Sequence, residues 1–206
     1  MLINLRNALM AGKRLPYDAE VEYLQSSRTQ WIDTGVAGQS GIDMDFGFSL
    51  TSIGSAQAIG GCWTDLQSLY VGIVRANGYF AYHYGNTDNA IVQIQRVATN
   101  TYYHVQAHLY NGEQYYILNG NKSAVGAIAG NFVSPLNIHL FRINASTPTY
   151  SNGVRIYALK IYVNGVLVRD YIPVRKGTVG YLYDRVSGKL FGNAGTGDFV
   201  VGPDKN

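Results

Sequence analysis

Two aspartates carry the spacing that comes nearest to a catalytic pair. In the run Asp43-Met44-Asp45 the two carboxylates are two residues apart, so they share one face if the run is a strand. A glycoside hydrolase needs two carboxylates that flank the bond to be cut. The chain has only three glutamates, and none belongs to an E-x-D-x-x-E arrangement along one strand. We therefore interpret Asp43 and Asp45 as part of a solvated strand edge, with a glycoside hydrolase as a remote alternative.

The histidines and the cysteine fit no catalytic or metal-binding template. His104 and His108 would form a metal pair on a helix, but the surrounding pattern predicts a strand, where residues i and i+4 are about 13 Å apart. Cys62 is the only cysteine, so no disulfide forms within the chain, and its neighbours predict a small buried side chain. There is no G-x-S-x-G, P-loop or dinucleotide motif. The sequence thus predicts no enzyme, no cofactor and no metal site, with calcium left open although no motif holds it.

The composition favours a folded β protein. Of the 206 residues, 47% are hydrophobic and 14% are charged, which allows a sizeable core and argues against disorder. The 17 tyrosines suit pleated surfaces, and the 24 glycines suit turns between short strands. The net charge is +3, but no basic run is longer than Lys13-Arg14, so nucleic acid is not an expected partner. We expect no membrane span and no signal peptide, because no apolar stretch is long enough.

Asparagine-glycine dipeptides mark the expected hairpins. Both residues tolerate positive φ, which a two-residue type I′ turn requires. Five such dipeptides begin at Asn77, Asn111, Asn119, Asn152 and Asn164. Around Asn77-Gly78, a two-residue loop predicts that Ile73 lies opposite Tyr82. One face of this hairpin is expected in the core, namely Leu69, Val71, Ile73, Phe80, Tyr82 and Tyr84.

Three further hairpins are predicted. Residues 154–163 and 166–173 turn at Asn164-Gly165, which places Ile161 opposite Val168. Their buried face is expected to hold Ile161, Val163, Val166 and Val168. Residues 105–110 and 113–118 form a hairpin with one shared side, made of Val105, Ala107 and Tyr116. Residues 181–186 and 189–191 turn at Ser187-Gly188, and Gly192, Gly195 and Gly197 form a tight loop before Phe199. We interpret this C-terminal run as the segment that closes the fold, with a binding loop as the alternative.

Many short strands without a long helix predict an all-β sandwich or barrel in residues 19–206. Residues 1–18 are interpreted as a separate N-terminal segment, helical or extended. In it Leu2, Leu5 and Leu9 share one helical face, and Gly12 is placed to end the helix. So short a helix needs a partner surface. That surface is either the chain's own sandwich or, if the segment is an anchor, another subunit or protein.

Several runs of the chain resemble the laminin-G-like, concanavalin A-like jelly rolls. The most distinctive are 21–27 (VEYLQSS), 30–35 (QWIDTG), 170–175 (DYIPVR) and 182–199 (LYDRVSGKLFGNAGTGDF). Runs at 102–105, 116–120, 138–141 and 153–157 follow the order of the same family. Together, over residues 20–203, they resemble short proteins of this superfamily that phages, prophages and gut bacteria encode. The resemblance implies an antiparallel jelly-roll β-sandwich.

The resemblance also implies a function. It points to a non-catalytic binding module, either a fibre or decoration protein of a phage virion or a surface protein, that recognises host glycans. A purely structural decoration protein, attached through its N-terminal segment, is the alternative. In both cases the expected location is a virion or an extracellular surface, with other virion or surface proteins as partners. A homotrimer is left open.

A glycan site requires exposed aromatic rings flanked by amides and carboxylates, because the rings stack on sugar C–H groups while the hydroxyls need fixed polar partners. One stretch of the sequence, a predicted hairpin with its flanking loops, gathers these residue types. The candidate ligand-binding residues are Trp63, Asp65, Tyr70, His83, Asn86 and Asp88. Packing of the same side chains in the core or at its rim is the alternative.

Overall fold

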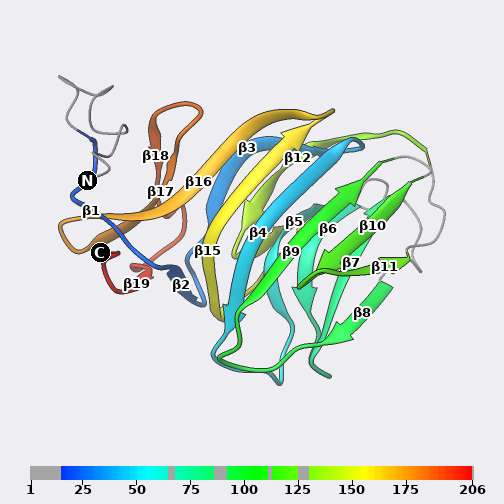
Figure 1. Cartoon of the computed structure of the whole chain (residues 1–206), viewed down its shortest axis with the longest axis horizontal. Helices are drawn as coiled ribbons and strands as arrows, with labels where there is room; N and C mark the ends of the chain where they lie inside the picture. Colours follow the sequence, from blue (N-terminus) through cyan, green and yellow to red (C-terminus); the bar gives the residue numbers. More distant parts are fainter. Residues whose placement is uncertain (1–14, 65–67, 86–91, 111–112, 125–129, 206) are drawn as a thin grey trace, which may run out of the picture.

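The computed structural model describes residues 15–64, 68–85, 92–110, 113–124 and 130–205, and in these ranges the regular elements are all β-strands. They form two sheets that pack face to face, with the larger sheet in front in Figure 1. Strand β5 (Gln57–Trp63) pairs in parallel with β13 (Arg142–Asn144), and the other described pairings shown by the two sheets are antiparallel. The predicted all-β jelly-roll sandwich is confirmed. The described ranges contain no helix of the length and apolarity that a membrane span requires.

The larger sheet has eleven strands. Its main path runs β11 (Asn121–Ala124), β10 (Gln114–Leu118), β9 (Tyr103–Leu109), β4 (Ile42–Leu50), β15 (Asn152–Val163), β16 (Val166–Lys176), β17 (Val179–Asp184) and β18 (Lys189–Phe191). At one end β1 (Ala19–Glu20) joins β16, while β2 (Leu24–Ser27) joins β15 and β19 (Val200–Val201). Segments from both ends of the described chain therefore lie side by side here (Figure 1).

The smaller sheet has eight strands. Its main path runs β14 (Thr149–Tyr150), β13, β5, β6 (Ser68–Val74), β7 (Tyr79–Gly85) and β8 (Val92–Arg96). The remaining strands are β12 (Val133–Leu140), which pairs with β5, and β3 (Ile32–Gln39), which pairs with β12. The sheet lies behind the larger one in Figure 1.

Aromatic rings fill the space between the sheets. Phe48 of β4 stacks on Phe80 of β7 with ring centroids 5.6 Å apart. Tyr116 of β10 meets Tyr82 of β7 at 4.4 Å. All four side chains are fully buried. Side chains alternate along a strand, so the residues of β4 and β9 that lie between buried positions point outward from the larger sheet. That outer face carries the candidate site.

Two predicted hairpins have the expected register. Gln114 pairs with Leu109 and Leu118 with Val105, so Val105, Ala107 and Tyr116 lie on the buried side, as predicted. Asn111 and Gly112, which join these strands, lie outside the described residues. The C-terminal hairpin also forms, although β17 ends at Asp184 rather than at residue 186.

The register predicted around Asn77 is wrong. Arg75 donates from its amide to the carbonyl of Tyr79, so the loop has three residues rather than two. Gly78 takes a φ of 82°, whereas Asn77 does not adopt positive φ, which is the geometry of a turn followed by a glycine bulge. Ile73 consequently lies opposite Ala81 instead of Tyr82. The six residues predicted for the core of this hairpin are nevertheless all buried.

The turn at Asn164-Gly165 is the predicted two-residue turn, with φ of 49° and 77°. The register then shifts, because a bulge between Ile161 and Tyr162 places Ile161 opposite Arg169 rather than Val168. Ile161 is buried as expected, but Val166 is 64% exposed, so its predicted burial is wrong. Val163 and Val168 pack against the core but are only partly buried, so this hairpin is less covered than predicted.

Residues 1–14 lie outside the described residues. The interpretation of Leu2, Leu5 and Leu9 as a partner-anchoring face therefore stays a prediction, as does the boundary between residues 18 and 19. The first strand, β1, begins at Ala19.

Candidate functional site

The structure places part of the predicted ligand-binding set. Trp63 ends β5 and is 38% exposed, whereas His83 on β7 is only 6% exposed. The backbone of Tyr70 pairs with His83 across β6 and β7, but its side chain lies outside the described part of the chain. The other three predicted residues, Asp65, Asn86 and Asp88, lie outside the described residues. A ligand-binding role for the set stays a prediction.

The two aspartates that the sequence interpretation set aside lie in the middle of the larger sheet. β4 is paired on both sides, with β9 and β15, so the prediction of a strand edge is wrong. Asp43 and Asp45 do share the outer face of β4, because the burial of β4 alternates along this part of the strand. In Figure 1 this face is turned toward the viewer.

Asp43 lies directly opposite His108 of β9. The Nδ1 atom of His108 is 2.6 Å from Oδ1 of Asp43, and the hydroxyl of Tyr110 donates to Oδ2 of the same carboxylate at 2.9 Å. Both oxygens are thus engaged from one side. Burial, followed by this bond to Asp43, raises the pKa of Tyr110, so Tyr110 keeps its proton and remains a donor.

Three rings stack in a row on this face. His108 stacks on Tyr110 with centroids 4.2 Å apart, and on Tyr115 of β10 at 4.7 Å. The ammonium of Lys122 on β11 lies 3.7 Å from the centre of the Tyr115 ring, a cation–π contact. The rings belong to β9, to the residue that follows it and to β10, and Lys122 extends the row to β11. Each ring fixes the orientation of the next. The imidazole of His108 is therefore held in a fixed orientation on the outer face of the sheet.

A second acid–histidine pair follows along the same strands. The Nε2 atom of His104 lies 2.7 Å from Oδ1 of Asp45, and Nε2 of Gln106 donates to Oδ2 at 3.5 Å. The side chains of His104 and Asp45 are 43% and 38% exposed, so this pair is open to a ligand from solvent. Donors and acceptors of fixed geometry therefore stand side by side along β4 and β9.

Two tyrosine rings extend the outer face of the larger sheet. Tyr102 is 52% exposed and lies over Gly47 of β4, where a Cβ atom would be within 2.6 Å of its hydroxyl. It meets Tyr157 of β15 edge-on at 5.0 Å, and the hydroxyl of Tyr157 lies 3.1 Å from that of Ser49. Partial burial, and next the charge of Asp45, raise the pKa of Tyr102. Glycine at position 47 makes room for this ring.

A hollow of about 380 Å³ lies beside the pair of Asp43 and His108 and extends to Asp45. Its lining is Asp43, Met44, Asp45, Gln106, Ala107, His108, Tyr115, Ile117, Tyr162 and Gly165. A second hollow of about 660 Å³ opens at the adjoining end of the sandwich, where Tyr110 and Asn164 belong to its wall. Tyr110, in the wall of the second hollow, donates a hydrogen bond to Asp43, in the wall of the first.

Carboxylates and imidazoles in such a row bind hydroxyl groups well, because each carboxylate oxygen accepts more than one hydrogen bond and each imidazole can donate. Exposed rings beside them can stack on apolar C–H faces. In the described ranges, no three His, Cys, Asp or Glu side chains converge as metal ligands. The outer face of the larger sheet thus has the groups that a polar, ring-shaped ligand needs.

Single-sequence reasoning missed this site for a definite reason. Asp43 and His108 are 65 residues apart in the chain, and only the pairing of β4 with β9 brings them together. A usable signal was nevertheless present: Asp43 and Asp45 are two residues apart and His104 and His108 are four apart, so each pair lies on one face of its strand. If the pairing of these two strands had been predicted, the alternation of side chains would have placed all four on one face of the sheet.

No family model matches the chain, and no curated protein matches it in sequence. Among solved structures, a Bacteroides ovatus protein described as a candidate carbohydrate-binding protein superposes with a TM-score of 0.62 at 12% identity, over 91% of this chain and 61% of its own. The CBM40 of a Ruminococcus gnavus sialidase, bound to α2,3-sialyllactose, superposes with a TM-score of 0.53 at 17% identity, over 68% of this chain and 89% of its own. A mutant of Trypanosoma rangeli sialidase superposes with a TM-score of 0.47 at 12% identity, over 59% of this chain and 20% of its own.

The likenesses to the Bacteroides ovatus and Ruminococcus gnavus structures identify the fold alone. At 12% and 17% identity they agree with the jelly-roll sandwich derived above. The chain spans about a fifth of the sialidase and 61% of the Bacteroides ovatus protein. The residues of this chain must therefore carry any statement about ligands.

Proposed function

We propose that the chain is a non-catalytic module that binds glycans on the outer face of its larger sheet. The observation that carries the proposal is the row of acid–histidine pairs, Asp43 with His108 and Asp45 with His104, flanked by the exposed Tyr102. Sugars need this combination of fixed polar partners and aromatic surface. Two solved structures of the same fold are described as carbohydrate-binding proteins or modules, which supports the choice of glycans as the ligand class.

The electrostatics favour neutral over acidic glycans at this face. Each of the two carboxylates would repel an acidic sugar, while the histidines supply a compensating positive charge only when protonated. Two ammonium groups belong to this face: that of Lys122 is held against the ring of Tyr115, and Lys160 of β15 is the cross-strand neighbour of Asp45. A ligand of neutral hydroxylated rings meets acceptors at Asp43 and Asp45 without that repulsion.

A glycan array tests the proposal. The wild-type chain is expected to bind a restricted set of neutral glycans, with and without calcium. Because hydrogen bonds to a charged group are strong, Asp45→Asn and His108→Ala should each weaken binding by about tenfold or more. Asp198→Asn is the matched control, since Asp198 is exposed and lies outside the face. A blank array at high protein concentration contradicts the proposal.

The proposal also covers where the module is displayed. The resemblance to proteins of phages and gut bacteria supports display on a virion or a bacterial surface, with host glycans as the targets. An N-terminal anchor in residues 1–18 would join the module to other virion or surface proteins. Deleting residues 1–18 tests this arrangement: the truncated chain should keep glycan binding and lose incorporation into the assembly. Incorporation at the wild-type level would exclude the anchor.

A further inference from the structure

A separate hollow lies on the smaller sheet, against the exposed indole of Trp63. Its volume is about 410 Å³, within the range of small-molecule sites. The described residues that line it are Trp63, Thr64, Leu136, Asn144, Ala145 and Ser146. The preceding residue, Cys62, is buried in the core, so Trp63 points outward from β5. This outer side is the one turned away from the acid–histidine pairs.

The lining combines the features that a single sugar ring requires. The indole gives an apolar face, and Leu136 and Ala145 add apolar surface beside it. The amide of Asn144 and the hydroxyl of Ser146 give polar partners. Among the described lining residues none is charged. The chemistry therefore suits a neutral ligand with one apolar face and a hydroxylated edge.

A hydrogen-bonded chain holds the amide of Asn144 in place. Its Nδ2 atom donates to the carbonyl of Asn137 at 3.0 Å. The amide of Asn137 in turn donates to both oxygens of Asp33, at 3.1 and 3.3 Å. With its Nδ2 fixed in this way, Asn144 offers Oδ1, which accepts no hydrogen bond from the described residues, to an incoming hydroxyl. A polar group held by supporting residues binds at a lower entropic cost than a mobile one.

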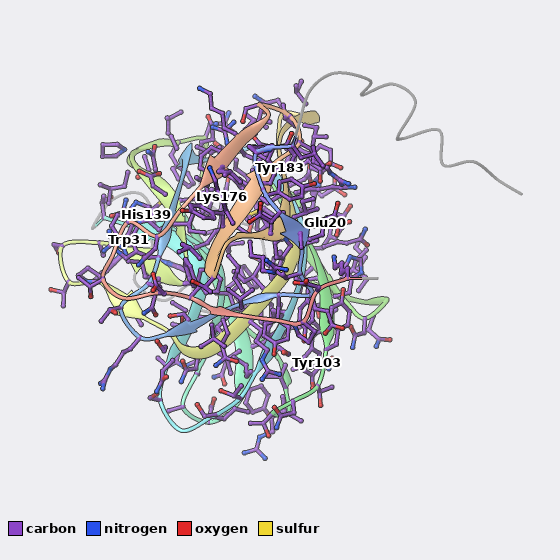
Figure 2. All side chains as sticks on the ribbon, turned by 90° about the vertical axis from the view of Figure 1, so that its left-hand side faces the viewer. Glu20, Trp31, Tyr103, His139, Lys176 and Tyr183 are labelled. Atoms are coloured by element: carbon purple, nitrogen blue, oxygen red, sulfur yellow. The ribbon has the colours of Figure 1, made fainter. Side chains whose placement is uncertain are left out.

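This series of hydrogen bonds, which runs from Asn144 to Asp33, ends beside a rigid aromatic cluster. Asp33 faces His139, with Oδ2 3.7 Å from Nε2. The imidazole of His139 stacks on Trp31 at 4.3 Å, and the guanidinium of Arg142 lies 3.4 Å from the centre of the Trp31 ring. Figure 2 shows Trp31 and His139 next to each other. The two tryptophans thus differ in role: Trp31 is covered by its neighbours, and Trp63 is left for a ligand.

We propose that the hollow beside Trp63 is a second saccharide site, which holds one neutral pyranose unit stacked on the indole and hydrogen-bonded to Asn144. It lies on the opposite sheet from the acid–histidine face. The chain then carries two sites that point in opposite directions. Such an arrangement lets one copy bridge two glycan chains and raises the avidity of a multivalent surface.

Tryptophan fluorescence tests the second site directly, because Trp31 and Trp63 are the only tryptophans. A Trp31→Phe variant, checked for folding by its melting curve, leaves Trp63 as the sole reporter. The probes are the methyl glycosides of glucose, galactose, mannose and N-acetylglucosamine, with N-acetylneuraminic acid as the charged comparison. At least one neutral probe should shift the emission saturably and protect Trp63 from acrylamide quenching. Asn144→Ala in the same background should weaken this response about tenfold.

The matched control is Asn152→Ala, which removes an exposed asparagine side chain elsewhere in the fold. If Trp31→Phe fails to fold, the indole N–H signals of the wild-type chain replace fluorescence, and one signal should move while the other stays. Asp45→Asn must leave the Trp63 response unchanged, so failure of the first site and failure of the second are distinguishable. No response to any neutral probe, or a response to N-acetylneuraminic acid alone, overturns the proposal.

Discussion

The Nε atom of Arg142 donates a hydrogen bond of 2.9 Å to Nδ1 of His139. The imidazole must be an acceptor at that atom, so the geometry requires neutral His139 with its proton on Nε2, toward Asp33. Only 6% of the His139 side chain is exposed. Burial, followed by the charge of Arg142, lowers the pKa of His139 to about 4, although Asp33 opposes the shift.

Acid should therefore destabilise the fold through His139. Since its pKa falls from 6.5 in the unfolded chain to about 4 in the folded one, the unfolded chain binds more protons between these values. The contribution to stability is complete above about pH 6.5 and declines as the pH falls toward 4, by roughly 3 kcal/mol in total. Urea unfolding at pH 7.5, 6, 5 and 4 measures this decline.

His139→Gln is the control for the pH effect, because glutamine is polar but does not titrate. Its free energy of unfolding should be lower at pH 7.5 and should vary less between pH 6.5 and 4 than that of the wild type. An unchanged slope in His139→Gln would assign the acid sensitivity to other groups.

Asp184 should be a major contributor to the C-terminal hairpin. It is fully buried, and its carboxylate accepts the backbone amides of Asp170, Val186 and Ser187 and the hydroxyl of Ser187. Asp184→Ala leaves those donors without their acceptor, so the free energy of unfolding should fall by about 3 kcal/mol. Thermal or urea unfolding measures the loss.

The exposed Asp198 supplies the control for that substitution. Asp198→Ala should change the free energy of unfolding by less than about 0.5 kcal/mol. Equal effects of the two variants would show that the hairpin does not depend on its buried carboxylate. A large loss in Asp184→Ala would support a role of the C-terminal hairpin in closing the fold.

Cys62 should be inert in the folded chain. Its side chain is fully buried, and burial raises the pKa of the thiol to about 11. At pH 8 about one part in a thousand would then be thiolate, the form that reacts. A disulfide reagent should label Cys62 at a rate set by unfolding, and immediately in denaturant. Labelling of the native chain as fast as a free cysteine would contradict the predicted burial.

Local patterns in the sequence were enough to predict the strand class and several turns. Asn164-Gly165 forms the expected type I′ turn because both residues adopt the positive φ that it needs. What failed was register, since the bulge at Ile161 and the three-residue loop before Tyr79 depend on packing across the whole sheet. The same limit hid the site: cross-strand neighbours of Asp43 come from residues far along the chain, and alternation alone does not say which strands pair.

Backbone NMR tests the central claim most directly. The assigned chain is titrated with the strongest neutral glycan from the array, and amide shifts are followed along every strand. Binding at the acid–histidine face predicts saturable shifts at Asp43, Asp45, His104 and His108, with the β17–β18 hairpin unaffected. They should vanish in the double variant Asp45→Asn/His108→Ala at the same ligand concentration. If saturable shifts map elsewhere and leave β4 and β9 unmoved, the larger sheet is not the glycan-binding face.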